Sequence, residues 1–329
     1  MKVLITGGAG FIGSHISEFL LKKKNIKKII IFDNFKDGSL KNVNILKNKK
    51  KIQIVKCDIL NKKKLFSYFK NIDIVIHLAA MSDIVPSIEQ PSLYMHTNII
   101  GTMNVLEAMR KFKTKKIVYA ASSSCYGIPK KFPTTEEHEI DTKYPYAFSK
   151  YIGELTIMHW SKVYKIDFVS LRLFNVFGTR SRTHGAYGAA LGIFLKQKIE
   201  NKPFTVVGNG KQKRDFIYVT DVANAFYLSL KKDIKNKILN IGFGAPNTVN
   251  EMVKIIGGKK SYIPKRPGEP FITHADIRTA KKVLKWKPKI KFRDGIKVVL
   301  KDINYWKNAP LWNEKKIMIA TKNWFKYLK

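Results

Sequence analysis

Cysteine, arginine and acidic residues are scarce in this sequence of 329 residues. The two cysteines, Cys57 and Cys125, lie far apart and match no metal-ligand spacing. Neither a disulfide framework nor a metal site is therefore implied, and buried thiols are the simplest interpretation. Asp and Glu number 24 against 62 Lys and Arg, and only eight of the basic residues are arginine, so the net charge of +38 comes mainly from lysine.

Long apolar runs are also missing. No stretch of about 18 apolar residues occurs, so neither a transmembrane helix nor membrane insertion is expected. The N-terminal segment passes from Val3, Leu4 and Ile5 straight into glycines, without the apolar stretch and cleavage site of a signal peptide. We therefore expect a cytoplasmic protein. Hydrophobic residues make up 45% of the chain, which is enough for a full core.

The lysine excess allows two interpretations, a basic field for nucleic acid or membranes and a solvated lysine surface. The lysines are scattered in short runs such as 22–24 and 49–51, and no RNA-binding aromatic motif accompanies them. We therefore predict a solvated surface and no specific nucleic-acid partner. Such a surface would still attract a diphosphate substrate.

Apolar strand patterns alternate with amphipathic helix patterns over the first half of the chain. This alternation predicts a parallel sheet covered by helices on both faces. Near-continuous apolar strands are typical of burial on both sides. The predicted strands are Lys2–Thr6, Lys28–Phe32, Ile52–Lys56, Ile74–His77, Lys116–Ala120 and Asp167–Leu173, and the predicted helices lie near Phe11–Lys24, Lys62–Phe69, Leu93–Phe112 and Tyr144–Val163.

The rhythm changes after about Leu173, where short segments and turn residues dominate. We predict one domain over residues 1–173, to which later segments return, and a smaller lobe made mainly from residues 174–329. The segment 305–329 is rich in aromatic residues and is expected to pack on the body or on a partner.

A glycine-rich segment, Gly7 to Gly13, follows the first predicted strand and opens the first predicted helix. Gly7 permits a tight turn, Gly10 lets the backbone approach a pyrophosphate, and Gly13 lets helix and strand pack closely. The helix N-terminus offers N–H groups to phosphate. Asp33 ends the second strand 20 residues after Gly13. A carboxylate there can bind ribose hydroxyls and repel a 2′-phosphate, which predicts NAD rather than NADP.

Two further strand ends lie where the cofactor crevice of such a sheet is expected. Asp58 follows the third predicted strand, and Leu78, Ala79 and Ala80 follow the fourth. The pattern alone leaves cofactor contacts and ordinary strand ends equally open.

Tyr146 and Lys150 lie four residues apart, on one face of a predicted helix. A nearby ammonium favours phenolate, so we expect Lys150 to lower the pKa of Tyr146 and to make it a general base. The serines at 122–124 end the fifth predicted strand, where a hydroxyl can share a hydrogen bond with the reacting oxygen. Ordinary turn chemistry is the alternative for these serines.

With these motifs the sequence resembles the extended short-chain dehydrogenase/reductase family, in its NAD-dependent sugar epimerase/dehydratase branch. The resemblance covers about residues 1–300. It implies a Rossmann-type doubly wound α/β sheet with a smaller C-terminal substrate-binding lobe. The motifs that carry it are Gly7–Gly13, Asp33, Leu78–Ala80, Asn98, the serine cluster, Tyr146 with Lys150, Arg172–Gly178, Arg214–Val219 and Arg266–Glu269.

The resemblance also implies roles for single residues. Tyr146 is expected as the acid/base, Lys150 as its partner, and Ser122, with Ser123, as the catalytic serine. The expected cofactor contacts are Gly7, Gly10, Phe11, Ile12, Gly13, Asp33, Asn34, Asp58, Ile59, Leu78, Ala79, Ala80, Asn98, Tyr146 and Lys150. The expected substrate contacts are Ser82, Ser122, Ser124, Tyr146, Asn175, Arg214, Arg266, Glu269 and Thr273.

The expected reaction is NAD-dependent epimerisation at C4 of a nucleotide-diphosphate sugar through a 4-keto intermediate. Dehydratases of the family carry an Asp-Glu pair after the catalytic Ser or Thr, and decarboxylases use a glutamate in that loop. Here Ser123 and Ser124 stand in those places. Another reaction on the same scaffold is an open alternative: that of a keto-sugar reductase, another epimerase or a dehydratase with a displaced acid. The remaining alternative is a non-enzymatic protein that binds NAD or nucleic acid.

UDP is the expected nucleotide part of the substrate. In similar 4-epimerases a bulky tyrosine narrows the sugar pocket four residues after the acid of the Arg-x-Gly-acid motif. Thr273 occupies that position here, so UDP-N-acetylglucosamine is expected beside UDP-glucose and UDP-glucuronate. The resemblance also implies a homodimer formed through the Tyr146 helix.

Overall fold

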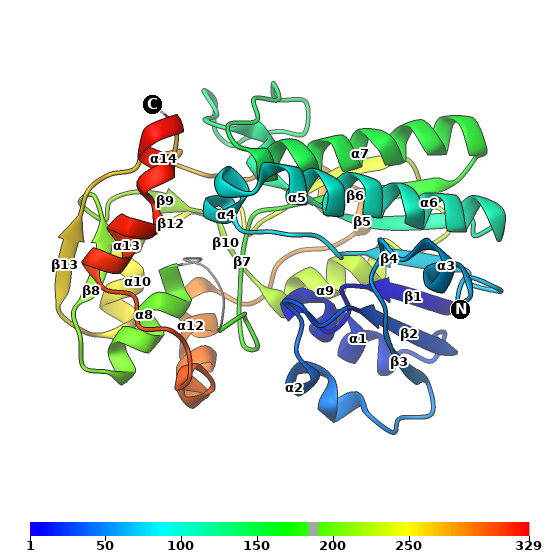
Figure 1. Cartoon of the computed structure of the whole chain (residues 1–329), viewed down its shortest axis with the longest axis horizontal. Helices are drawn as coiled ribbons and strands as arrows, with labels where there is room; N and C mark the ends of the chain where they lie inside the picture. The colour runs from blue at the N-terminus through cyan, green and yellow to red at the C-terminus, as the bar shows by residue number, and fades with distance from the viewer. Residues whose placement is uncertain (184–189, 329) are drawn as a thin grey trace.

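The computed structural model describes residues 1–183 and 190–328. Its central feature is a seven-stranded sheet in the order β11-β6-β5-β4-β1-β2-β3, in which all neighbouring strands are parallel (Figure 1). The expected doubly wound parallel sheet is confirmed. Its strands are β1 (Lys2–Thr6), β2 (Lys28–Asp33), β3 (Ile52–Lys56), β4 (Ile74–His77), β5 (Lys116–Ser122), β6 (Asp167–Leu173) and β11 (Lys237–Ile241).

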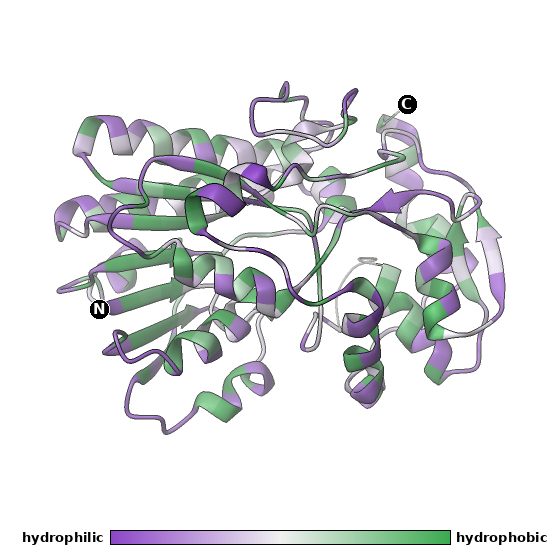
Figure 2. Ribbon diagram, turned by 180° about the vertical axis from the view of Figure 1, so that it is seen from behind, coloured by the Kyte–Doolittle hydropathy of each residue, from purple (hydrophilic) through white to green (hydrophobic). Residues whose placement is uncertain are grey.

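Both faces of this sheet are buried. Val3 and Ile5 of β1 pack in one hydrophobic core with α1 (Phe11–Leu21) and α9 (Val219–Leu228). Leu4 points the other way, into a core shared with α6 (Gly101–Lys111) and α7 (Pro145–Tyr164). Figure 2 shows the consequence, with strands that are hydrophobic along most of their length. Alternate residues of each strand therefore serve different cores.

The predicted elements differ from the observed ones mainly at their ends. β5 continues to Ser122 and β2 to Asp33, while α1 ends at Leu21. The single helix expected over Leu93–Phe112 is divided into α5 (Pro91–Met95), a π-helical turn η2 (His96–Ile100) and α6. The last strand of the sheet, β11, comes from the second half of the chain, as does α9, which packs on α1.

The remaining strands form three short pairs beside the sheet. β7 (Asn175–Phe177) pairs with β10 (Phe216–Tyr218), β9 (Lys213–Arg214) with β12 (Asn247–Thr248), and β8 (Phe204–Val207) with β13 (Lys260–Ile263). A separate hydrophobic core holds most of these elements together with helices of the second half. Those helices are α8 (Ala190–Ile199), α10 (Val249–Ile256), α12 (Phe292–Lys301), η4 (Ile303–Trp306), α13 (Glu314–Ala320) and α14 (Lys322–Tyr327).

The aromatic C-terminal segment packs on the body of the molecule, because Trp306 and Trp324 are buried in the core of the second half. Both cysteines are free and buried, as expected. Among the described helices none is long and apolar enough to cross a membrane. The other short elements are α2 (Leu40–Val43), η1 (Asn44–Leu46), α3 (Lys62–Phe66), α4 (Ile84–Glu89), η3 (Ser123–Tyr126) and α11 (Arg278–Leu284).

A buried ion pair fixes α7 to the sheet. Arg172 of β6 and Glu154 of α7 lie 2.6 Å apart, with side chains only 4% and 2% exposed. Glu154 also accepts a hydrogen bond from the Ser170 hydroxyl, and Arg172 donates to the Tyr126 hydroxyl and to the Glu136 carbonyl. The charges are thus satisfied on several sides, which a buried pair requires.

Replacing Glu154 with Gln should lower the free energy of unfolding by about 3–5 kcal/mol, because Arg172 would keep a buried charge without its counter-ion. Urea unfolding followed by circular dichroism measures the loss. Lys143→Gln is the control, since it removes the exposed pair with Asp141, and it should cost less than about 1 kcal/mol. Equal losses in the two variants would contradict a special role for the buried pair.

Candidate active site

A cavity of about 800 Å³ opens at the carboxyl ends of the central strands and reaches the elements of the second half. Carboxyl ends of parallel strands meet at one edge of the sheet, which is where ligands bind in such folds. Every predicted site residue except Asn98 lines this cavity. The cavity therefore brings residues from 7 to 273 together.

The glycine segment forms the floor at one end of the cavity. Gly7 has a φ of +69° and donates its N–H to the Phe32 carbonyl at 2.7 Å. A side chain on Gly13 would collide with the Gly7 carbonyl oxygen, so this close approach needs glycine. Helix α1 begins here with Gly10 as its N-cap and without a side-chain cap, so its first N–H groups suit a phosphate.

Asp33 lies beside the glycine segment and is buried. Its two carboxylate oxygens accept the N–H groups of Ala9 and Phe35, at 2.9 and 2.8 Å. Burial raises the pKa of Asp33, and the two backbone hydrogen bonds oppose that shift. Each oxygen keeps lone-pair capacity for a ribose hydroxyl. The residues present therefore fit the adenosine end of a dinucleotide.

Asn34 and Asp58 lie next to each other across the ends of β2 and β3, with the Asn34 amide donating to Asp58 at 2.8 Å. Ile59 follows in the same wall and packs against Gly101. The residues that close the opposite side are Leu78, Ala79, Ala80 and Ser82. This arrangement places all the expected strand-end residues around the same cavity.

Asn98 is the exception among the predicted cofactor contacts. It is 1% exposed and does not line the cavity. Its side chain bonds both the N–H and the carbonyl of Met81, at 2.8 and 3.0 Å, and donates to the Ser149 hydroxyl. Asn98 therefore positions the loop after β4, and its side chain does not reach the cavity.

Tyr146 and Ser122 meet inside the cavity. Ser122 lies close enough to the Tyr146 phenol to oppose the effect of burial on its pKa, and both residues line the cavity. Ser122 also accepts the Ser124 N–H and donates to the Ser124 hydroxyl at 3.0 Å. Ser123 and Ser124 line the same wall. The Tyr146 phenol and the serine hydroxyl groups at the end of β5 thus line one cavity, where they could pass a proton at a reacting oxygen.

The expected effect of Lys150 on Tyr146 is not found. Burial raises the pKa of the Tyr146 phenol, and the Ser122 hydrogen bond opposes that shift. Burial also lowers the pKa of Lys150 to about 7, with Glu154 opposing. The Lys150 ammonium lies over the Tyr119 ring at 4.2 Å. Spacing along a helix places the two groups on one face, but the desolvation of both groups determines the direction of their pKa shifts.

Two arginines and one carboxylate form the far end of the cavity. Arg214 contacts Glu269 at 2.7 Å, and Arg266 contacts the other oxygen of Glu269 at 2.9 Å. The side chains of the two arginines are 11% and 16% exposed. A guanidinium fork held in this way suits phosphate oxygens, so this cluster fits a diphosphate.

Asn175 and Thr273 are bonded to each other in the wall of the same cavity. The Thr273 hydroxyl donates to the Asn175 side-chain oxygen at 3.0 Å and accepts the Asp215 N–H at 3.1 Å. Both residues line the cavity. The threonine is thus held in place by its hydrogen bonds and leaves the room that a tyrosine would fill.

Sequence reasoning missed an ionic bridge on the cavity wall. Arg182 contacts Asp37, in the loop after β2, at 2.8 Å and also contacts Asp83, just before α4. All three residues line the cavity. Nothing local in the sequence indicates this bridge, because its three residues are far apart along the chain. Asp83 follows Asp37 by 46 residues and precedes Arg182 by 99.

The three comparisons with known proteins agree with this geometry. The sequence model described as "NAD dependent epimerase/dehydratase family" matches residues 3–242. This chain belongs to that family. The family's cofactor is NAD, and the glycine segment, Asp33 and the strand ends described above fit it.

Individual members of the family align with nearly the whole length of this chain. A UDP-glucuronate 4-epimerase of Thermodesulfobacterium geofontis is 36% identical over 309 residues, 89% of this chain and 93% of the relative. The UDP-glucuronic acid 4-epimerase of Bacillus cereus, solved with UDP-glucuronic acid and NAD, superposes with a TM-score of 0.87 at 31% identity, over 93% and 99% of the two chains. The UDP-N-acetylglucosamine 4-epimerase of Methanobrevibacter ruminantium, solved with UDP-N-acetylmuramic acid, gives 0.85 at 31% identity, over 92% and 98%.

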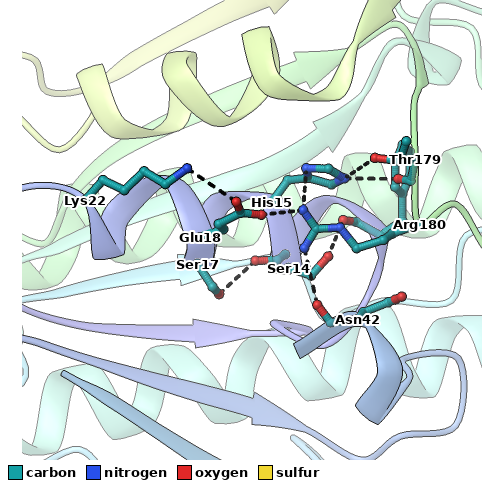
Figure 3. Close-up of polar contacts among 10 residues, drawn as sticks. Ser14, His15, Ser17, Glu18, Lys22, Asn42, Thr179 and Arg180 are labelled. Carbon is teal, nitrogen blue, oxygen red and sulfur yellow. Dashed lines mark hydrogen bonds and ion pairs between the residues drawn. The ribbon is translucent and has the colours of Figure 1, made fainter. Parts of the chain in front are cut away.

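In this epimerase-family chain, the segment after β7 is pinned to α1, as Figure 3 shows. Arg180 contacts Glu18 at 2.5 Å, donates to His15 Nδ1 at 3.0 Å and donates to the Asn42 carbonyl. His15 Nε2 donates in turn to the Thr179 carbonyl at 3.0 Å. Because arginine only donates, Nδ1 must accept, so the imidazole is neutral here. Burial and the Arg180 charge lower the pKa of His15 to about 4.

His15 should make stability depend on pH. Between pH 6.5 and about 4 the unfolded chain binds a proton that the folded imidazole does not, so stability falls as the pH falls through this window. At pH 5 the loss from this one group amounts to about 2 kcal/mol relative to pH 8, at 1.36 kcal/mol per pKa unit. Urea unfolding at a series of pH values measures it.

The variant His15→Gln should lose this part of the pH dependence, and its difference from the wild type should shrink toward pH 5. His159→Gln is the control, because His159 is exposed and lies at the far end of α7. If the free energy of unfolding of His15→Gln falls with pH as steeply as that of the wild type, the neutral, buried imidazole is not what destabilises the protein in acid.

Proposed function

We propose that this chain catalyses the NAD-dependent epimerisation at C4 of a UDP-linked sugar. The observation that carries the proposal is that Tyr146 and Ser122 line the same cavity as the glycine segment and the Arg214–Glu269–Arg266 cluster. An acid/base, a dinucleotide site and a diphosphate site are the parts that this reaction needs. The substrates named for the similar proteins support the UDP handle.

The residues of the chain divide the work among them. Arg214 and Arg266 bind the diphosphate and hold the sugar near α7. NAD, which the glycine segment and Asp33 would hold, would supply the acceptor and donor of the hydride at C4 of the sugar. Tyr146 removes the proton of the 4-hydroxyl group and gives it back after the sugar has turned, with Ser122 bonded to the same oxygen.

The turn after β5 argues against two other reactions of the family. Elimination of water or loss of CO2 needs a carboxyl group near the sugar, and residues 123 and 124 are both serine. A keto-sugar reductase is the second candidate, because it needs the same tyrosine and cofactor site. It would consume NADH, whereas the epimerase reuses the cofactor that it holds.

The sugar pocket admits more than one substrate in this proposal. Thr273 is small and is held by Asn175, so there is room for a substituent that a tyrosine would exclude. UDP-N-acetylglucosamine, UDP-glucose and UDP-glucuronate are the proposed substrates.

We further propose a cytoplasmic homodimer that associates through the Tyr146 helix. Phe148 and Leu155 are seven residues apart on α7, so they share one helix face, and they are 45% and 38% exposed. Ile100, on the neighbouring η2, is 41% exposed. Large apolar side chains gathered on adjacent helices favour association with a second copy.

Proton NMR of the anomeric region tests the reaction. The purified enzyme is incubated with each of the three UDP-sugars, without added cofactor. A signal from the C4 epimer is the expected result and indicates that NAD stayed bound during purification. If no sugar changes even after NAD is added, the epimerase proposal fails for these substrates, and consumption of NADH with a 4-keto sugar then tests the reductase.

Tyr146→Phe should lower kcat by about 10²–10⁴-fold, the range expected when a general acid/base is removed. The variant should still retain NAD, because the glycine segment and Asp33 are untouched. Cofactor content measured after denaturation and NMR turnover give the two readouts. Tyr164→Phe, at the exposed end of the same helix, is the control. Near-normal turnover of Tyr146→Phe would contradict the mechanism.

A further inference from the structure

The C-terminal helix α14 contributes a residue to the cavity wall. Trp324 is 3% exposed, lines the cavity and donates its indole N–H to the Pro267 carbonyl at 2.6 Å. Its neighbours Phe325 and Tyr327 on the same helix are 40% and 61% exposed. The helix therefore turns one aromatic side chain into the cavity wall and leaves the others at the surface. Figure 1 shows α14 near β9, whose Arg214 belongs to the diphosphate cluster.

Trp324 touches both halves of the proposed machinery. The Arg266 guanidinium lies over its ring, with Cζ 5.3 Å from a ring centroid. On another side the Tyr144 ring lies 6.0 Å away, centroid to centroid. Tyr144 lies close enough to Ser124 for that hydroxyl to oppose the effect of burial on its pKa, and it precedes Tyr146 by two residues. The indole thus contacts Arg266 of the diphosphate cluster and also Tyr144, two residues before Tyr146.

This place determines what Trp324 can do. Trp324 lines the same cavity as Arg214, Arg266 and Tyr146, and its ring contacts Arg266, so a diphosphate-linked sugar bound on the arginines would lie near the indole. We infer that Trp324 is a positioning residue, which forms one wall of the sugar compartment and holds Arg266 in place for the diphosphate. The inference rests on the proposed function.

Two contacts make the positioning effective. The indole N–H fixes the backbone at Pro267, next to Arg266 and two residues before Glu269. The ring face attracts the guanidinium and limits its rotamers. Ordering this loop in advance removes an entropy cost that would otherwise fall on substrate binding. Loss of the indole should therefore weaken UDP and UDP-sugar binding more than it slows the chemical step.

The test compares Trp324→Leu and Trp324→Phe with the surface variants Phe325→Leu and Tyr327→Leu. For each protein, KM and kcat for a UDP-sugar, the Kd of UDP by calorimetry, the retained NAD and the melting temperature are measured. Trp324→Leu should raise KM and the UDP Kd by about tenfold, equivalent to ~1.4 kcal/mol, with kcat within about threefold of the wild type. Trp324→Phe keeps a ring face but lacks the N–H donor, so its effect should be intermediate.

NAD content should stay at the wild-type level in both Trp324 variants, because the glycine segment is elsewhere in the cavity. The two surface variants should behave as the wild type in every readout. Should Trp324→Leu fail to fold, Trp324→Phe decides the question through its UDP Kd. Wild-type UDP affinity in a folded Trp324 variant overturns the inference, and so does an equal loss of NAD and UDP, which would indicate a general structural role.

Failure of the proposed reaction has a different signature. If the wild type binds UDP but epimerises no UDP-sugar, the reaction is wrong, and the UDP Kd of the variants still tests Trp324. If the wild type does not bind UDP, both the UDP handle and the role of Trp324 are overturned.

Discussion

The position of α7, the helix that carries Tyr146, depends on one buried ion pair. Arg172 of β6 and Glu154 of α7 leave almost no surface in contact with water. Two charges at such depth are tolerable only with ordered partners around them, and Ser170 and the Tyr126 hydroxyl supply these. Tyr126 reaches onward to Asn240 of β11. Strands β6 and β11, the turn after β5 and the helix that carries Tyr146 are therefore held in one arrangement.

What the sequence predicted well is what local order determines. A strand, a glycine turn, a helix and an acid at the end of the next strand are consecutive, and the parallel sheet brings all strand ends to one edge. Ser122 and Tyr146 could be placed together for the same reason. Arg214, Arg266 and Glu269 lie in segments without a clear periodic pattern, so only the family resemblance brought them into the site.

The remaining features depend on partners that are distant in the chain. The family motif predicts that Asn98 contacts the cofactor, but its side-chain amide is hydrogen-bonded to the backbone of Met81. The bridge from Arg182 to Asp37 and Asp83 joins three loops. The sequence shows only that Trp324 belongs to an aromatic-rich segment, and its position beside Arg266 comes from the structure. The pKa directions of Tyr146 and Lys150 also required the burial of each group, which spacing along a helix does not give.

The division between lysine and arginine explains why the net charge says little about function. Lysine provides most of the charge of +38, and scattered lysines solvate well at a surface. Five of the eight arginines have side chains no more than 20% exposed, and each of them is paired with at least one carboxylate: Arg172, Arg180, Arg182, Arg214 and Arg266. A planar fork makes several directed hydrogen bonds with less loss of freedom than a lysine stem. In this chain, the rarer cation therefore marks the positions where geometry matters, and all five lie along the cavity or hold the elements that form it.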